Sequence, residues 1–583
     1  MLNFYNYPNM TKAVIPDKVL ITNNDFSNRY KNLRNLKSGD IPICVTNMSQ
    51  TCLSCAQLTS VPVCGENVIN MYRAYYYCRN LTGNPVCGNN VTDIRSAYSS
   101  CYNLTGSPVC GNNVIYMDSA YTSCYNLTGS PVCGNNVTTM SGTYSSCRNL
   151  TGSPVCGNNV TNMSDTYSYC SNLTGNPVCG NNVTNMYRTY SGCSNLTGNP
   201  VCGDNVIDMC ATYSDCTNLT GIPVCGNNVT TMSFTYSNCT NLTGNPVCRN
   251  NVINMSNTYY NCSNLTSNPV CGEKVTNMYY TYAYCKNLIG NPVCGNSVTT
   301  MWSTYSDCTN LTGNPVCGEN VTNMGWAYSG CSNLTGNPVC GNNVTNMSNT
   351  YSGCSNLTGN PVCGNNVTNM GYTYFLCRNL TGIPVCGDNV TDMNHAYYWC
   401  NNLTGNPVCG EKVTNMVYTY FNCNNLTGSP ACGNNVTNMF CTYYCCRNLY
   451  GNMYMYSNNV NDVSGCFYGR NAYNILNIYV LENSTSLNTV LRNDYRSITS
   501  NDITWVNNNG SYYCESINTY IYPVTNVYDA AKKNGDYIDD SILQDFTYEK
   551  IDGKYHITGW KGTYNGTPST ECIIPSSNKI VIQ

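Results

Sequence analysis

The sequence predicts a repeat solenoid, and three observations support this prediction. One motif of 23 residues recurs without slip from Cys55 to Cys446, so 17 copies lie head to tail. Leu, Val, Met and Tyr return at fixed places in each copy, which a disordered low-complexity chain would not show. Nearly every copy also carries a glycine-containing turn, as in the clearest one, CSNLTGNPVCGNNVTNMSNTYSG (residues 331–353). An unbroken period of this length is typical of a solenoid, in which each repeat buries its apolar face against its neighbours.

Each copy divides into an extended piece, a turn and a second piece. In the copy that begins at Leu334, residues 334–340 read as extended and residues 341–343 as a turn with a permissive glycine. The fixed residues of the second piece stand at offsets 0, 3, 4 and 7, which is one face of a helix. We therefore predict one short strand and one short helical turn per repeat. The predicted core residues are Leu334, Val339, Val344, Met347, Tyr351 and Cys354.

The pattern VTNM-x-x-[TA]Y-x-x-C-x-x-LT, which covers about residues 45–470, resembles the bacterial-surface-protein-A-like (BspA-like) leucine-rich repeat family. The resemblance implies a right-handed leucine-rich-repeat coil and a surface adhesin. Three features depart from the family. Asn337 and Pro338 interrupt its usual strand, so we expect a strand as short as residues 338–340, because proline cannot donate to a ladder. The usual Leu or Ile at the helix start is Met here, except at Ile94, and the usual Phe is Tyr.

The period divides the chain into three predicted parts. Residues 1–44 form an N-terminal cap or attachment segment, and residues 45–471 form the solenoid, whose last copy at 458–471 is displaced by one residue. Residues 472–583 form a β-rich C-terminal cap or module. We expect its strands within 473–483, 502–524 and 548–566, and a helix within 527–546.

The charge of the chain limits its partners. Its net charge is −3 and charged residues are only 9% of it, so it lacks the basic stripe that nucleic acid requires and a polybasic membrane face. No segment approaches the ~18 apolar residues of a membrane helix, and the N-terminal sequence lacks a secretory pattern. We therefore expect an extracellular surface or virion location reached without a signal peptide, with a cytoplasmic location left open.

Most of the 43 cysteines fall in two columns. The column of Cys354 is interpreted as small buried side chains, since free cysteine is among the most buried residue types. For the column of Cys340, three interpretations stay open: inert thiols, disulfides, or a soft metal. The two columns alternate at 14 and 9 residues, which is not a zinc-finger spacing, so no metal site is predicted.

The sequence offers little for catalysis. It has two histidines, of which His395 occupies a variable, surface position, and it has no phosphate loop and no catalytic-triad spacing. We therefore predict no enzyme and no cofactor. Repeated Asn-Leu-Thr and Asn-Val-Thr match the glycosylation pattern, but dense modification beside buried Leu and Val would obstruct stacking. Asparagine ladders between coils are the favoured interpretation.

Variation between copies concentrates at positions opposite the predicted core face. Many of these outward residues are Ser, Asn, Gly or Asp, whereas others are large aromatics. This pattern fits neutral drift on a solvated surface, or a binding surface for a glycan or protein. The candidate binding residues are Phe375, Tyr398, Trp399, Tyr418, Phe421, Trp302 and Trp326.

The leading hypothesis is a non-enzymatic adhesion or recognition rod that binds a cell-surface glycan or protein, for example as a phage fibre or another receptor-binding part of a virion. In that case other virion proteins are further partners. The alternative, from a different class, is a structural spacer or scaffold without a specific ligand.

Overall fold

The computed structural model describes residues 4–16, 19–61, 64–85, 87–108, 110–471, 473–492, 505–515, 518–534 and 536, and the backbone of five later strands. The chain divides into two compact units, Met1–Thr312 and Gly313–Gln583. Each unit is described by itself.

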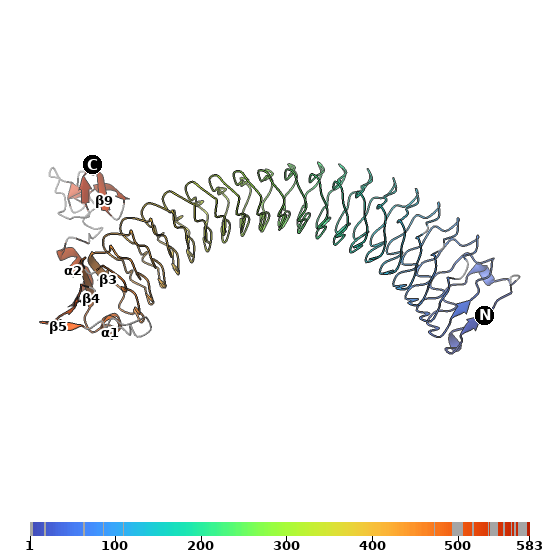
Figure 1. Cartoon of the computed structure of the whole chain (residues 1–583), viewed down its shortest axis with the longest axis horizontal. Helices are drawn as coiled ribbons and strands as arrows, with labels where there is room; N and C mark the ends of the chain where they lie inside the picture. The colour runs from blue at the N-terminus through green and yellow to red at the C-terminus, as the bar shows by residue number, and fades with distance from the viewer. Residues whose placement is uncertain are drawn as a thin grey trace. The chain divides into compact units, whose positions relative to one another are not determined.

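Both units contain coils that follow the 23-residue period and lie side by side (Figure 1). In the coil of Tyr351, Asn346 forms isolated parallel bridges with Asn323 and Asn369, one coil away on either side. Beyond the bridge, every second backbone N–H donates to the carbonyl 22 residues later, over 3.0, 2.9, 2.9 and 2.7 Å; the donors are Met347, Asn349, Tyr351 and Gly353. Between them, the N–H groups of Thr350 and Ser352 donate to carbonyls three residues back in the same coil, and that of Ser348 donates to the Asn346 side-chain oxygen.

This alternation replaces the short strand and the helical turn that the sequence predicted. Asn349 and Gly353 are left-handed, with φ of 56° and 76°, and a left-handed residue every fourth position interrupts a helix. Residues 338–340 form no strand, because Pro338 lacks an N–H and the polar groups of Val339 bond to a side chain. The repeat solenoid itself is confirmed.

The core consists of ladders that run from coil to coil. The Tyr351 ring stacks between those of Tyr328 and Tyr374, with centroids 5.6 Å away on each side. Leu334, Val344, Met347, Tyr351 and Cys354 are fully buried. Val339, expected in the core, is only half-buried. Its neighbour Pro338 is the buried residue of the extended piece, since adjacent residues of an extended chain face opposite ways.

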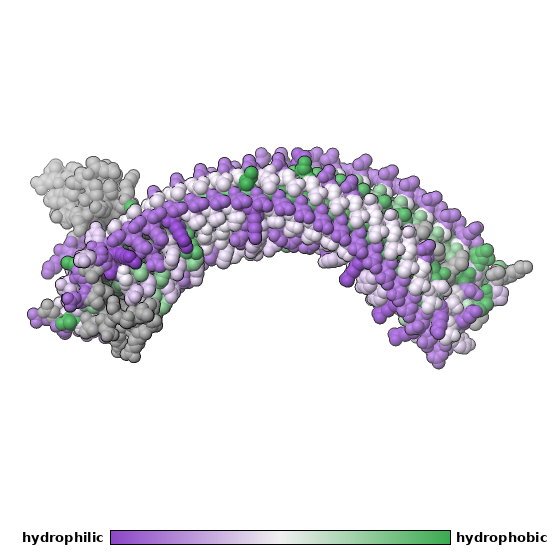
Figure 2. Space-filling view, viewed as in Figure 1, coloured by the Kyte–Doolittle hydropathy of each residue, from purple (hydrophilic) through white to green (hydrophobic). Residues whose placement is uncertain are grey.

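The asparagines of the glycosylation-like motifs form ladders. The Asn366 amide donates to the Asn342 carbonyl of the preceding coil over 2.9 Å. In the other column, the Asn264 amide donates to the Asn241 side chain over 3.4 Å. Figure 2 shows hydrophilic residues as continuous bands across successive coils of each unit. The polar repeat residues thus connect neighbouring coils at the surface.

The N-terminal part of unit 1 contains η1 (Phe4–Asn6), β1 (Lys12–Ala13), η2 (Thr22–Asn24) and β2 (Ser38–Gly39), with β1 and β2 paired in parallel. A further coil begins within this part, because Asp25 bridges Asn47. Phe26, Tyr30 and Leu33 are buried in it. They take the places of Met, Tyr and Cys in the repeat, which hid this coil from the sequence pattern.

Unit 2 ends its coils in a mixed sheet, so the predicted β-rich cap is confirmed. The sheet order is β3-β4-β7-β6-β5, and the first three strands are parallel. Cys432, in the last regular repeat, bridges Met455 of β3, which extends the coil edge into the sheet. The strands are β3 (Gly451–Met455), β4 (Leu476–Leu481), β5 (Val506–Asn508), β6 (Ser511–Cys514) and β7 (Thr519–Val524).

Two helices accompany this sheet. The first, α1 (Thr485–Arg492), has no counterpart in the sequence prediction. The second, α2 (Val527–Lys533), begins where predicted, and the Asn526 side chain caps it by accepting from two backbone N–H groups. It ends at Lys533, and residues 537–545 of the predicted helix lie outside the described residues. No helix in the described part of the chain is long and apolar enough to cross a membrane.

The later strands form two small sheets. β8 (Phe546–Ile551), β9 (Lys554–Trp560) and β12 (Ile580–Ile582) pair in the order β12-β9-β8. β10 (Thr563–Tyr564) and β11 (Thr567–Pro568) pair with each other. The three predicted domain boundaries stay predictions.

Candidate recognition surface

Aromatic side chains gather on the outward positions of consecutive coils in unit 2. Their rings contact one another, and all of them are half-buried. We call this set the aromatic ridge: Tyr372, Phe375, His395, Tyr398, Tyr418, Phe421, Phe440, Tyr444 and Tyr468. It is separate from the core ladder, in which each coil already contributes its own buried tyrosine.

One column of the ridge follows the core tyrosine directly. Phe375 stacks on Tyr398 at 4.9 Å, Tyr398 on Phe421 at 4.8 Å, and Phe421 on Tyr444 at 4.4 Å. Tyr468 continues the stack at 4.9 Å from Tyr444. The column therefore occupies five consecutive coils, and the coil spacing sets the distance between the rings.

A second column stands two residues after the core methionine and includes a histidine. His395 lies flat on Tyr372 at 4.4 Å and is tilted against Tyr418 at 4.7 Å. Its Nδ1 is 2.5 Å from the Asn394 side-chain oxygen. Desolvation lowers the pKa of His395 to about 4, so the imidazole is neutral near pH 7. His395 is therefore a neutral ring near pH 7 that packs between Tyr372 and Tyr418.

Contacts between the columns make the ridge one surface. The ring of His395 is 5.4 Å from that of Tyr398, and the ring of Tyr418 is 5.4 Å from that of Phe421. Neighbouring rings cover each other's faces within each column. A ligand therefore meets ring edges, because face-to-face separations of 4.4–4.9 Å leave no room for a sugar ring between them.

The structure brings four of the seven candidate binding residues into the ridge: Phe375, Tyr398, Tyr418 and Phe421. Trp399 is half-buried beside it, but its ring lies under the Arg378 guanidinium, 5.2 Å away, instead of against another aromatic ring. Trp326 is 40% exposed, two coils before Tyr372, and Trp302 is half-buried in unit 1. No described aromatic ring stacks on either of these two tryptophans.

The candidate binding residues omitted five members of the ridge: Tyr372, His395, Phe440, Tyr444 and Tyr468. His395 was assigned to the surface as an isolated histidine, although Tyr372 and Tyr418 hold the same position in the adjacent copies. Tyr444 and Tyr468 continue the column of Phe421. Tyr468 does not fall at the expected 23-residue spacing, because the last copy is shifted by one residue.

The cysteine columns have the geometry of packing groups. The Cys354 thiol is fully buried and donates to the Tyr328 carbonyl of the preceding coil over 3.0 Å. Cys340 is half-buried and its sulfur lies against Gly364 of the next coil, where an added Cβ would come within 2.9 Å of it. Each such cysteine thus fills the space that the next coil's glycine leaves.

This environment makes the thiols poor nucleophiles. Desolvation raises the pKa of Cys340 to about 12 and also raises that of Cys354. The thiolate, which attacks disulfides and binds soft metals, is therefore scarce near pH 7. Among the described residues, no group of three or more His, Cys, Asp or Glu side chains is placed to hold a metal ion.

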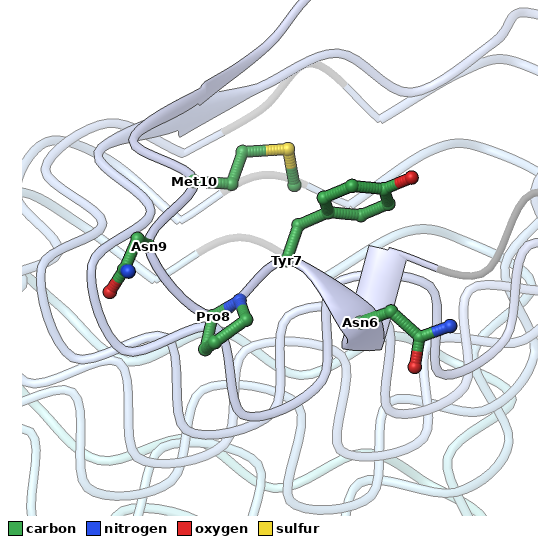
Figure 3. Close-up of a pocket in the computed structure, with 5 residues that line it drawn as sticks. All are labelled: Asn6, Tyr7, Pro8, Asn9 and Met10. Carbon is green, nitrogen blue, oxygen red and sulfur yellow. The ribbon is translucent and has the colours of Figure 1, made fainter.

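A shallow open pocket lies at the N-terminal end of unit 1. Five consecutive residues line it, from Asn6 to Met10 (Figure 3). Tyr7 and Met10 supply its apolar wall, and it contains no charged or nucleophilic group.

Comparisons with known proteins give a distant likeness in structure. No family model matches the sequence, and no curated protein matches it. A leucine-rich repeat protein from Bacteroides ovatus is similar over 72% of this chain and 87% of its own, with 12% identity and a TM-score of 0.33. A leucine rich cell surface protein from Faecalibacterium prausnitzii is similar over 60% of this chain and 86% of its own, with 17% identity and a TM-score of 0.31. The chain is thus similar in structure to bacterial leucine-rich repeat proteins, and the comparisons do not place it in the BspA-like family.

Proposed function

We propose that this protein is a non-enzymatic recognition solenoid and that the aromatic ridge is its binding surface. The observation that carries the proposal is the stack of Phe375, Tyr398, Phe421 and Tyr444 on the outside of consecutive coils. The fold does not require these rings, because the tyrosine ladder of the core is complete without them. Outward aromatics with few charges beside them are typical of interaction surfaces.

The exposed ring edges favour a protein partner over a glycan. Sugars are usually held against ring faces, and the ridge covers the faces of its inner rings. An apolar groove on a protein accepts a row of ring edges and gains from excluding water along it. The ridge also presents tyrosine hydroxyls, which can satisfy polar groups at the rim of such a groove.

The test compares binding of the labelled protein and its variants to a panel of bacterial and animal cells. The ridge variant replaces Phe375, Tyr398 and Phe421 with Ser. The matched control replaces Phe234, a 44% exposed outer aromatic of unit 1, with Ser. We expect the ridge variant to lose at least about tenfold in affinity, since aromatic anchors commonly contribute more than 1 kcal/mol each. The control should bind like the parent.

Treatment of the cells separates the classes of partner. Protease treatment should abolish binding, whereas periodate oxidation of glycans should leave it intact. The reverse pattern would assign the ridge to a glycan. If the ridge variant folds and binds like the parent, the spacer becomes the better account. A cell-surface or virion location stays a prediction.

A further inference from the structure

A second cluster lies on the outer face of unit 1, on the coils between Tyr72 and Arg148. Four guanidinium groups in it each lie over one or two tyrosine rings, at 5.1–5.6 Å from the ring centroids. They belong to Arg73, Arg79, Arg95 and Arg148. We call these arginines and the tyrosines under them the arginine–tyrosine patch.

The centre of the patch is a ladder in the position that follows the buried cysteine. Four consecutive copies carry Arg79, Tyr102, Tyr125 and Arg148 there. The two tyrosine rings stack at 5.0 Å, with Arg79 over Tyr102 at 5.6 Å and Arg148 over Tyr125 at 5.3 Å. The two tyrosine rings thus lie between the two guanidinium groups. This stacking fixes the positions of the guanidinium groups along the coils.

The remaining members widen this ladder across the coil face. Arg73 lies between the rings of Tyr72 and Tyr76, and Arg95 lies between those of Tyr72 and Tyr116. A guanidinium that stacks on a ring keeps its N–H donors in its own plane, directed away from the ring. Stacking therefore orients these donors without using them.

Among the residues that the structure describes, three of the four arginines form no ion pair with a carboxylate. Arg95 makes a bidentate contact with Asp93, over 3.0 and 2.7 Å. Arg73, Arg79 and Arg148 are exposed, and no ion pair joins them to any carboxylate in the part of the chain that the structure describes. The other carboxylate that acts on Arg95 is Asp118. The patch therefore carries excess positive charge within a chain of net charge −3.

From this geometry we propose that the arginine–tyrosine patch binds an anionic polysaccharide. Arg79 and Arg148 are three coils apart, which at the ~4.8 Å spacing of paired backbones is roughly 14 Å. A row of planar, bidentate donors at fixed spacing fits an extended polymer with regularly repeated carboxylate or sulfate groups. Tyr116 and Tyr125, 44% and 37% exposed, offer hydroxyls and ring edges to the sugars between those groups.

Nucleic acid fits the patch less well. The stacked pair of Tyr102 and Tyr125 has covered ring faces, whereas binding of single strands depends on open faces for bases. Residues 64–156 contain no lysine to neutralise further phosphates. The proposal goes beyond the proposed function, because it concerns a different surface and a different ligand.

The experiment measures binding of the full chain to immobilised heparin, which is sulfated, and polygalacturonate, which is carboxylated. Dextran is the control for an uncharged polysaccharide. Polyglutamate is the control for an acidic polymer that is not a polysaccharide. We expect binding to at least one anionic polysaccharide, none to dextran, and weaker binding at higher salt. Replacing Arg73, Arg79 and Arg148 with Gln should reduce the affinity at least about tenfold, since each charge-assisted pair is strong. The ridge variant should bind these polymers like the parent.

Two further variants make the test specific. Arg188→Gln removes a charge outside the patch, where Arg188 lies 3.6 Å from Asp165, and it should leave the affinity unchanged. The triple replacement with Lys keeps the charge but loses the planar fork, and it should still bind several-fold more weakly. The proposal is overturned if neither polysaccharide binds, if the Gln or Lys variant matches the parent, or if polyglutamate binds more tightly than both polysaccharides. Circular dichroism on each variant confirms folding.

Discussion

The Tyr351 hydroxyl bonds twice to the backbone of Val339, twelve residues earlier in the same coil. It donates to the Val339 carbonyl over 2.7 Å and accepts from the Val339 N–H over 2.9 Å. The next coil repeats the pair with Tyr374 and Val362. One phenol thus supplies what a neighbouring strand would give to the extended piece, which explains why the aromatic of this repeat is Tyr.

Tyr351→Phe should therefore destabilise its coil although it keeps the ring. The loss leaves an N–H and a carbonyl of Val339 without their partner, which costs about 1–3 kcal/mol. Native-state hydrogen exchange should report this decrease in the free energy of opening, most strongly at the Val339 amide. Tyr372→Phe, on the outer face, is the control and should change the opening free energy by less than about 0.5 kcal/mol. Equal effects of the two substitutions would contradict this role of the hydroxyl.

Tyr351→Ala removes a whole ring from the stack of Tyr328, Tyr351 and Tyr374. We expect a cost of roughly 3–5 kcal/mol, as for other large-to-small core changes. The loss should stay within a coil or two of Tyr351, because coils contact only their neighbours. Hydrogen exchange measures this reach, and equal loosening of every coil in the unit would contradict the solenoid account.

The sequence predicted the buried columns well but not the path of the backbone. Met347, Tyr351 and Cys354 recur in nearly every copy, and the position of Thr350 is always Thr or Ala, so their offsets identified one inward face. The same offsets suggested a helix, because the left-handed positions of Asn349 and Gly353 hold different residues in different copies and give no constant glycine signal. The bonds from Tyr351 to Val339 were not predictable, since they depend on the fold of the coil.

The outer surface and the cap were also predictable only in part. Alignment of the copies revealed the outward aromatics. The ring contact of His395 with Tyr372 and the contact of Trp399 with Arg378 could not be predicted, because they depend on the distances between coils. In the cap, alternation and turns predicted segments that contain β4, β5, β6, β7, β9, β10 and most of β8, but not β3, β11 or β12. The sheet order β3-β4-β7-β6-β5 was not predictable, because it depends on long-range pairing.

The thiols should be reduced and protected. Burial of Cys354 and the raised pKa of Cys340, about 12, both suppress reaction. In native protein at pH 7.5, iodoacetamide should modify few column cysteines, whereas in denaturant without reductant it should modify most of them. Mass spectrometry distinguishes the two states. Recovery of mainly disulfide-linked peptides, or stoichiometric zinc in the purified protein, would contradict the packing role.

The coils around His395 should lose stability as the pH falls. The folded pKa of His395 is about 4, below its ordinary value of 6.5, so between these values the unfolded state binds a proton that the folded state does not. The contribution of His395 is therefore fully present above pH 6.5 and declines toward pH 4. Hydrogen exchange, corrected for intrinsic rates, should show this decline at coils near His395. His395→Phe should remove it, and an unchanged pH profile in that variant would assign the decline to other groups.

The most direct test of the ridge is hydroxyl-radical footprinting of the unmodified protein, free and bound to the cells that it recognises. Mass spectrometry then measures the oxidation of individual aromatic side chains. The account predicts that binding protects Phe375, Tyr398, Phe421 and Tyr444, while Phe234 keeps its oxidation rate. Unchanged oxidation of the ridge in the bound protein would contradict the claim that these rings form the recognition surface.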